Sequence, residues 1–122
     1  KILQNISDKK KNEILRKSDI FLICSKSRAE SFGIVILEAL SAGLPLIVSD
    51  VKGSGMKDMI RNNVNGYLFK PKSFKDCANK IKKNSSSFKK LSRFSKSSLE
   101  IFDKNFSKKI IEKKMQSLYI RG

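Results

Sequence analysis

The segment from Glu30 to Gly43 holds the residues whose types and spacing are best suited to chemistry. Two carboxylates, Glu30 and Glu38, stand eight positions apart, with a glycine and an apolar run between them. Eight helical residues span about 12 Å, or roughly two turns. Because the free N–H groups at a helix start attract phosphate, we expect a diphosphate there, with the two carboxylates holding hydroxyl-rich groups.

The apolar run predicts one buried helix that positions this pair. Gly33 lies near the helix start, where a missing side chain lets a ligand approach the backbone closely. Gly43 stands just past the helix end, where a left-handed cap favours glycine, and Pro45 prevents any continuation. Glu38 would then lie within an otherwise apolar helix, so it must be paired or must meet hydroxyl donors.

Continuous apolar runs of strand length flank this helix at 19–25 and 46–50, and both are typical of buried parallel strands. The Asn65-Gly66 turn signal introduces a third candidate strand at 67–69. Alternation of strands with helices implies a doubly wound α/β fold with a parallel sheet. Open sheets of this kind bind ligands where a strand leads through a loop into a helix, as residues 19–33 do.

Further helices are expected around the sheet. Ser7 or Asp8 is suited to cap a helix that continues to Lys17, and Ser73 is suited to cap another that runs through Ile81. In the last third, apolar side chains recur near helical spacing, which predicts amphipathic helices with lysine-rich outer faces. The residues expected on their inner faces are Phe88, Leu91, Phe94 or Ser95, Leu99 and Phe102, and then Phe106, Ile110, Ile111, Met115, Leu118 and Tyr119.

The residues around the two carboxylates resemble the donor-site signature of family 4 glycosyltransferases. The matching pattern is Glu30-x7-Glu38, with Phe32-Gly33 after the first glutamate and Ala39-Leu40-x-Ala42-Gly43-x-Pro45 after the second. Members of that family have the GT-B architecture, in which two Rossmann-like domains face a cleft. The resemblance implies that residues 1–104 form part of the donor domain, with a helix at 105–122 that braces the other domain or packs on its own sheet.

The resemblance also implies roles for individual residues. Glu30 would be catalytic, through contact with the donor sugar or stabilisation of charge at the reacting centre. The implied donor-binding residues are Phe32, Gly33, Ile34, Val35, Glu38, Gly53 and Asp58. Backbone N–H groups of residues 33–35 would meet the diphosphate or sugar, whereas the side chains of Phe32 and Ile34 fit a core position. Asp58 stands where the family commonly has Glu, and Ser31 where it usually has glycine.

The reaction that the resemblance implies is transfer of a sugar from a nucleotide diphosphate sugar to a glycan or lipid-linked acceptor, with retention of configuration. No metal or other cofactor is expected, which agrees with the lack of an Asp-x-Asp pair. The chain begins with Lys1, which suggests a piece of a longer hexosyltransferase. The phosphate-binding Arg and Lys and the acceptor domain would lie elsewhere, so the 122-residue chain is expected to be inactive alone.

Each implied role has a structural alternative. In place of a catalytic role, Glu30 at a helix N-terminus would only complement the helix dipole. In place of binding the donor, Glu38 would form a buried salt bridge with a lysine. In place of a donor-binding loop, the segment at Gly53 would be a simple turn. A degenerate remnant that keeps the fold without a ligand is a further possibility.

The net charge of +16 is large for 122 residues. It fits compositional drift, an anionic membrane surface or nucleic acid. A rival reading is therefore a basic binding module, which predicts aromatic side chains interleaved with lysine on an exposed surface. We expect the aromatics to be buried instead, and nucleic acid is disfavoured. The expected location is cytoplasmic, with or without peripheral contact at the membrane face.

The cysteine and histidine content limits the kinds of metal site and catalytic site that this sequence can form. The two cysteines, Cys24 and Cys77, lack metal-site spacing, which argues against a zinc site and a disulfide framework. Cys24 lies within an apolar run and is expected to be a reduced core residue. The absence of histidine excludes Ser-His and Cys-His catalysis within these residues.

Overall fold

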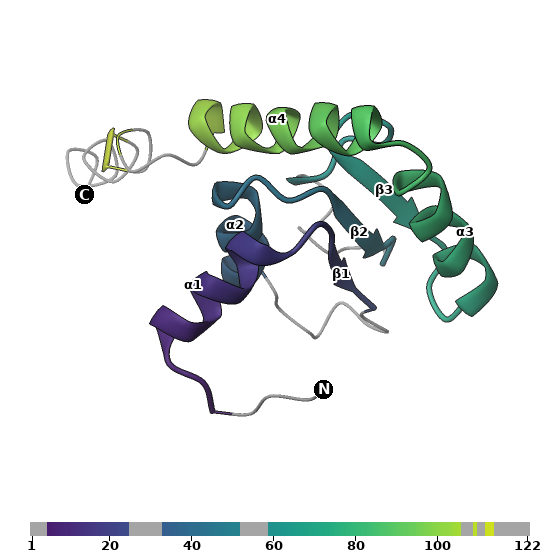
Figure 1. Ribbon diagram of the computed structural model, residues 1–122, viewed down its shortest axis with the longest axis horizontal. Coiled ribbons are helices and arrows are strands. Elements are labelled where there is room, and N and C mark those ends of the chain that lie inside the picture. Colours follow the sequence, from purple (N-terminus) through teal and green to yellow (C-terminus); the bar gives the residue numbers. More distant parts are fainter. Residues whose placement is uncertain (1–4, 25–32, 52–58, 106–108, 110–111, 114–122) are drawn as a thin grey trace, which may run out of the picture.

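The computed structural model describes residues 5–24, 33–51, 59–105, 109 and 112–113. Glu30, Phe32, Gly53 and Asp58 lie outside these residues, as does most of the helix expected at 105–122. The elements in chain order are α1 (Asp8–Lys17), β1 (Phe21–Ile23), α2 (Gly33–Ser41), β2 (Leu46–Ser49), β3 (Gly66–Phe69), α3 (Phe74–Asn84) and α4 (Phe88–Asn105). Figure 1 shows α4 lying across one end of the molecule and α3 at the side of the sheet.

The three strands form one parallel sheet in the order β1-β2-β3, which confirms the predicted fold class. Val48 of the central strand lies opposite Ile23 on one side and Leu68 on the other. All four residues of β2 are buried. Because both faces of a central strand are buried, its sequence is a continuous apolar run. For this reason, the position of β2 could be predicted from the sequence.

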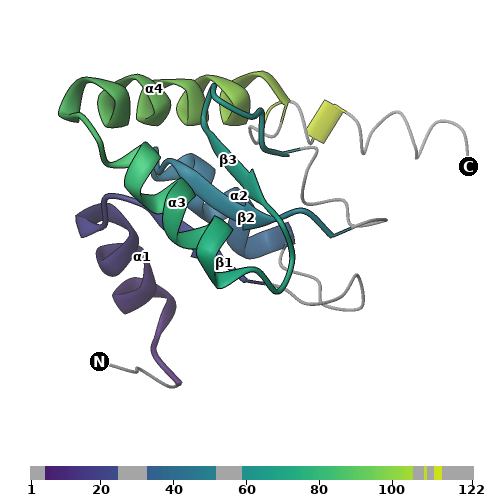
Figure 2. The same cartoon turned by 90° about the vertical axis from the view of Figure 1, so that its right-hand side faces the viewer.

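Helices cover both faces of this sheet. Leu46 and Val48 pack with residues of α2 and α4 in the larger core cluster, which includes Leu40 and Ile101. Ile47 points to the opposite face, where it packs with Phe69 of β3 and with Cys77 and Ile81 of α3. Side chains alternate along a strand, so one strand supplies both layers. Figure 2 shows α3 and α2 on opposite sides of the strands.

The predicted capping residues begin the outer helices. Ser7 Oγ accepts a 3.2 Å hydrogen bond from Lys10 N at the start of α1. Ser73 Oγ accepts a 3.1 Å hydrogen bond from Asp76 N at the start of α3. Each hydroxyl satisfies an N–H group that has no partner within its helix. These bonds explain why both helices begin where the sequence predicted.

The buried helix α2 ends as predicted. Gly43 adopts a φ of 72°, in the left-handed region where glycine is favoured. The Gly43 and Leu44 N–H groups donate to the carbonyls of Leu40 and Ala39, at 3.0 and 3.1 Å. Those bonds satisfy the last helical carbonyls before Pro45 leads into β2.

The orientation of α4 differs from the prediction. Phe88 is 86% exposed and Leu99 is 41% exposed, although both were expected to face inward. The buried residues are Phe94, Ser98 and Ile101. At about 100° per residue, Phe88 lies far around the helix from Phe94, so one apolar face cannot include both. The buried hydroxyl of Ser98 donates a 2.8 Å hydrogen bond to Leu44 O, which attaches α4 to the turn between α2 and β2.

The prediction for Cys24 is wrong, because its side chain is exposed. Strand β1 ends at Ile23, one residue before Cys24, and this strand at the end of the sheet order is itself only partly covered, since Leu22 is 43% exposed. Cys77 is the buried cysteine and belongs to the core under α3. Among the helices that the structure describes, none is long and apolar enough to cross a bilayer.

Candidate functional site

The candidate site lies at the carboxyl edge of the parallel sheet. Strands β1 and β2 run parallel, so their last residues, Ile23 and Ser49, end at the same edge. The chain passes from this edge through residues 25–32 into α2, which begins at Gly33. This is the arrangement in which open α/β sheets bind ligands. Glu30 and Phe32 belong to that connection, outside the described residues.

The first turn of α2 supplies the predicted backbone donors. Gly33, Ile34 and Val35 are its first three residues, and their N–H groups have no carbonyl partner four residues earlier within the helix. The first turn contains no acidic residue that would neutralise its positive end. The helix start therefore has the backbone chemistry that suits a phosphate or another anion.

Glu38 lies one helical turn further along α2, and a lysine is its partner. Lys11 Nζ of α1 lies 3.2 Å from Glu38 Oε1 in a hydrogen bond and 3.0 Å from Oε2 in an ion pair. The Glu38 side chain keeps 27% of its surface exposed, whereas its Oε2 atom is buried and accepts no hydrogen bond from the described residues. This is the lysine salt bridge that was the structural alternative for Glu38.

Lys11 is a site residue that the sequence reasoning missed. Its Nζ lies 3.4 Å from Asp8 Oδ1 on the preceding turn of α1 as well as beside Glu38. The hydrogen bond with Glu38 is the main cause of a pKa of Lys11 above its ordinary value of 10.5, and Asp8 acts in the same direction. The Asp8 spacing was a readable signal for an ion pair along α1. Contact with α2 depends on how the two helices pack.

The side-chain amide of Asn65 is buried where the chain enters β3, after residues 52–58. Asn65 is fully buried, and its Oδ1 accepts a 2.7 Å hydrogen bond from Arg61 N. Its Nδ2 donates a 3.2 Å hydrogen bond to Met59 O. One side chain thus links the residues that follow the predicted Gly53 loop to the start of a strand. Gly53 and Asp58 themselves lie outside the described residues.

The fold and the helix start define a Rossmann-like α/β domain, and comparison with known proteins identifies its family. The family model described as "Glycosyl transferases group 1" matches residues 1–100. The chain therefore belongs to the group 1 glycosyl transferases, and it matches the C-terminal domain of GT-B enzymes. This confirms the resemblance on which the predicted site rests, while the roles of the individual site residues stay predictions.

Three similar proteins illustrate this relationship. The sulfoquinovosyl transferase of Arabidopsis thaliana is 36% identical over 67 residues, which cover 52% of this chain and 12% of that protein. The C-terminal domain of the group 1 glycosyl transferase LpcC from Francisella tularensis has a TM-score of 0.76 at 23% identity, over 88% of this chain and 53% of that chain. HepE from Anabaena, in complex with UDP-glucose, has a TM-score of 0.75 at 23% identity, over 88% and 29%.

Proposed function

We propose that this chain is the donor-binding part of a retaining, metal-independent glycosyltransferase. The enzyme would transfer a hexosyl group from a nucleotide diphosphate sugar to a glycan or a lipid-linked saccharide. The observation that carries the proposal is the family match over residues 1–100 together with the start of α2 at the carboxyl edge of the sheet. The complex of HepE with UDP-glucose supports a nucleotide sugar as the donor.

In the proposed mechanism, the first turn of α2 receives negative charge from the donor. The N–H groups of residues 33–35 would stabilise the diphosphate as it leaves, because preorganised donors need no rearrangement when that charge develops. Glu30 would contact the sugar hydroxyls or stabilise positive charge at the anomeric carbon. Gly53 and Asp58 would border the sugar from the next loop.

Glu38 would accept hydrogen bonds from the ribose hydroxyls. Lys11 already donates to Oε1 and forms an ion pair with Oε2, which accepts no hydrogen bond from the described residues. Lys11 would then be a positioning residue, because it holds the carboxylate of Glu38 in one place on α2. The alternative is that the ion pair only attaches α1 to α2 and never meets a donor.

A comparison of two variants in the full-length polypeptide separates these roles. Glu38→Gln keeps the size of the side chain but weakens its acceptor strength, and Lys11→Met keeps the stem but removes the ammonium. If Glu38 binds ribose, calorimetric titration with UDP-glucose and GDP-mannose will show at least about tenfold weaker binding for Glu38→Gln. Lys11→Met will change that affinity less, and far-UV circular dichroism will verify that both variants are folded. Equal affinities in the two variants would leave Glu38 with a structural role only.

Glu30→Gln tests the chemical step. We expect turnover of the full-length enzyme to fall at least about a hundredfold while donor binding and the circular dichroism spectrum change little. Glu100→Gln, on the exposed side of α4, is the matched control for the loss of one carboxylate. Turnover of Glu30→Gln within twofold of the parent contradicts the role assigned to Glu30. We expect residues 1–122 alone to bind the donor weakly and to show no transfer.

A further inference from the structure

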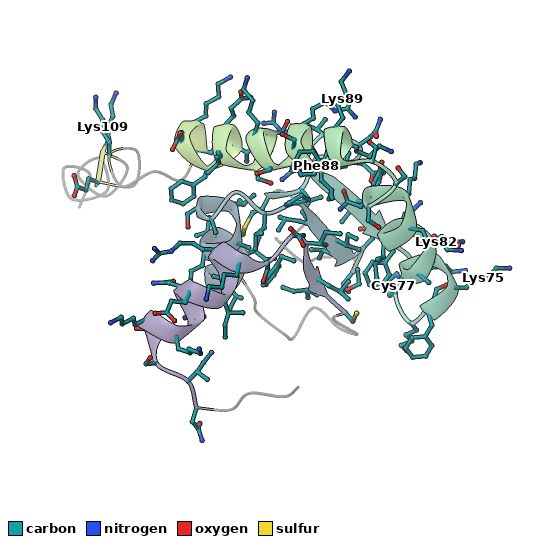
Figure 3. The ribbon with its side chains drawn as sticks, viewed as in Figure 1. Lys75, Cys77, Lys82, Phe88, Lys89 and Lys109 are labelled. Carbon is teal, nitrogen blue, oxygen red and sulfur yellow. The ribbon has the colours of Figure 1, made fainter. Side chains whose placement is uncertain are left out.

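The corner where α3 meets α4 carries a dense positive charge. Residues 70–96 contain ten lysines and arginines and a single acidic residue, Asp76, for a net charge of +9. We call the cations at the junction, together with Phe88, the basic corner. Its members are Lys82, Lys83, Phe88, Lys89, Lys90, Arg93 and Lys96. Figure 3 shows Lys82 and Lys89 projecting outward from the two helices.

The ion pairs identified between described residues leave these charges unneutralised. None of the ion pairs identified between described residues includes a cation of the basic corner. Lys83 and Lys90 instead share one aromatic ring, with Nζ atoms 5.1 and 5.9 Å from the centroid of Tyr67. Lys90 Nζ also donates a 3.3 Å hydrogen bond to Tyr67 Oη. The fold thus concentrates positive charge at this corner.

Helix stability does not explain this distribution of charge. Lys89 and Lys90 occupy the first turn of α4, which contains no acidic residue. The positive end of the helix dipole disfavours cations at that position. The acidic residues of α4, Glu100 and Asp103, lie in its second half, where the dipole disfavours them as well. A helix selected for stability alone would have the opposite order.

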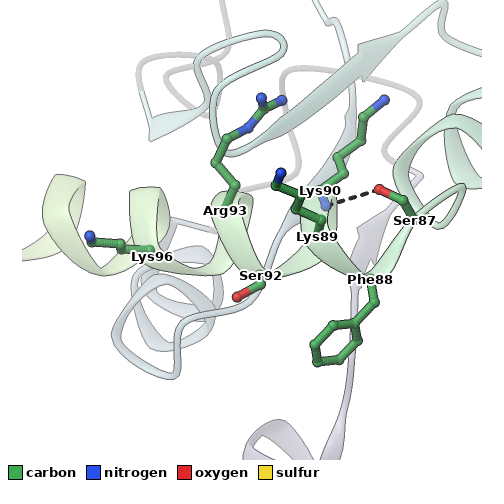
Figure 4. A pocket seen from close by; sticks show the side chains of 7 residues that line it. All are labelled: Ser87, Phe88, Lys89, Lys90, Ser92, Arg93 and Lys96. Carbon is green, nitrogen blue, oxygen red and sulfur yellow. Dashed lines mark hydrogen bonds between the residues drawn. The ribbon is translucent and has the colours of Figure 1, made fainter.

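An almost fully exposed phenyl ring lies at the same end of α4 as these cations, and Figure 4 shows it on the opposite side of the helix from the Lys90 and Arg93 side chains. Phe88 is 86% exposed and lines a shallow hollow of about 710 Å³ with Ser92, Lys89, Arg93 and Lys96 (Figure 4). Ser92 and Lys96 follow Phe88 by one and two helical turns, so all three lie on the outer arc of α4. The expectation that the aromatics are buried is therefore wrong at this position, since Phe88 does not reach the core.

We propose that the basic corner is a docking surface for an anionic lipid bilayer. The phenyl ring of Phe88 enters the interfacial layer, and the ammonium groups of Lys82, Lys89 and Lys96 lie against phosphate-bearing headgroups. Charge complementarity favours this occupant, since each lysine near an anionic surface adds to the attraction. An aromatic ring beside lysines is also typical of interfacial helices.

The composition of the corner favours a bilayer over nucleic acid. Five of its six cations are lysines, whose mobile point charges suit a fluid layer of headgroups, whereas paired phosphate recognition favours arginine. Binding of a single strand would use a series of stacked aromatics, and this corner exposes one phenyl ring.

The position of the corner leaves the candidate donor edge free. The buried side of α4 is attached near Gly43 and Leu44, just before the first residue of β2, through hydrogen bonds from Ser95 and Ser98. The donor edge lies at the opposite ends of the strands. The docking proposal therefore does not depend on the proposed function, and either one can fail without the other.

Vesicle binding with matched charge variants tests the proposal in the full-length polypeptide. The test variant combines Lys82→Gln, Lys89→Gln and Lys96→Gln, and the control combines Lys9→Gln, Lys17→Gln and Lys104→Gln. All six side chains are exposed, and both variants lose the same charge. We expect co-sedimentation with mixed phosphatidylglycerol and phosphatidylcholine vesicles to weaken at least about tenfold for the test variant and less than about twofold for the control.

A second pair of variants tests the phenyl ring. Phe88→Ser is expected to weaken binding by about threefold or more, because it removes the apolar group that enters the interface. Phe74→Ser serves as the matched control, since Phe74 is 90% exposed but lies at the other end of α3. Circular dichroism verifies the fold of every variant, and few contacts are lost because these rings are exposed.

Three results would overturn the proposal. Equal losses in the two charge variants would show that the net charge acts without a defined surface. Equal binding to phosphatidylcholine vesicles and to mixed vesicles would remove the role of lipid charge. Tighter binding to a single-stranded oligonucleotide than to mixed vesicles, at physiological salt, would assign the corner to nucleic acid.

Discussion

Lys11 of α1 and Glu38 of α2 form an ion pair in which Nζ lies 3.0 Å from Oε2, although 27 residues separate them in the chain. The pair joins an outer helix to the helix that begins at the candidate donor edge. Both side chains are about one-third exposed or less, so the interaction is screened less than a fully exposed pair. Through this ion pair, a side chain of α1 contacts a predicted donor-binding residue of α2.

The ion pair predicts a defined dependence of stability on pH. The pKa of Lys11 is raised in the folded protein, mainly by its hydrogen bond with Glu38, so the folded state holds this proton more tightly than the unfolded state. The resulting stability is fully present below the ordinary pKa of 10.5 and is lost as pH rises through the raised value. Urea unfolding of the parent and Lys11→Met should therefore differ most near neutral pH. A difference that grows above pH 10.5 would contradict the assignment.

Substitutions at two glycines are expected to lower the free energy of unfolding by very different amounts. A Cβ added at Gly66 would lie 1.8 Å from the carbonyl oxygen of Leu46 in the paired strand, so β2 and β3 would have to separate. We expect Gly66→Ala to lower the free energy of unfolding by more than about 4 kcal/mol, in the range of severe strain. Gly43→Ala meets Leu99 and Ser95 side chains at 3.2 Å with a φ of 72°, and should cost about 1–2 kcal/mol. Denaturant unfolding of the two variants provides the comparison, and equal losses would contradict the close approach of β2 to Gly66 as the cause.

The hydroxyl of Ser98 is expected to stabilise the attachment of α4. Its Oγ donates a buried 2.8 Å hydrogen bond to Leu44 O, so Ser98→Ala leaves that carbonyl without this donor. We expect a loss of about 1–2 kcal/mol in the free energy of unfolding. Ser92→Ala on the exposed side of the same helix is the control, since it changes helix propensity equally. Similar stabilities for the two variants would show that the Ser98 bond contributes nothing.

The two thiols should react at different rates with an alkylating reagent. Cys24 is exposed, whereas Cys77 is buried, and burial is the main cause of a raised pKa of the Cys77 thiol. At pH 8, Cys77 therefore has less thiolate than an ordinary thiol and less access to solvent than Cys24, and we expect iodoacetamide to modify it at least about tenfold more slowly than Cys24. Mass spectrometry of peptides over time measures both rates, and urea should make them similar. Faster modification of Cys77 in the folded protein would contradict its position under α3.

The prediction of fold succeeded where the signal was local. The continuous run at β2 identified a strand buried on both faces, and Ser7 and Ser73 marked helix starts by hydrogen bonds that span only three residues. Gly43 ended α2 with the left-handed backbone that glycine favours. Each of these features depends on neighbours along the chain, so no tertiary contact was needed to predict it.

The inner face of α4 was predicted less well. Its sequence offers apolar side chains on more than one side, and spacing alone grouped Phe88 and Leu99 with Phe94. The structure buries Ser98 instead, because a hydroxyl can occupy that position when the carbonyl of Leu44 accepts its hydrogen bond. No hydrophobic pattern contains this information, since the acceptor lies 54 residues away.

The sequence by itself determined the family signature, the parallel α/β order and the helix that carries Glu38, because these follow from local spacing, caps and apolar runs. Only the tertiary structure decided that Lys11 is the partner of Glu38 and that Phe88 is exposed at the lysine-rich start of α4. The reason is that both results depend on the packing of α1 against α2 and on the rotation of α4 about its axis. Packing between distant segments is set by the shape of the whole core, which no short stretch of sequence encodes.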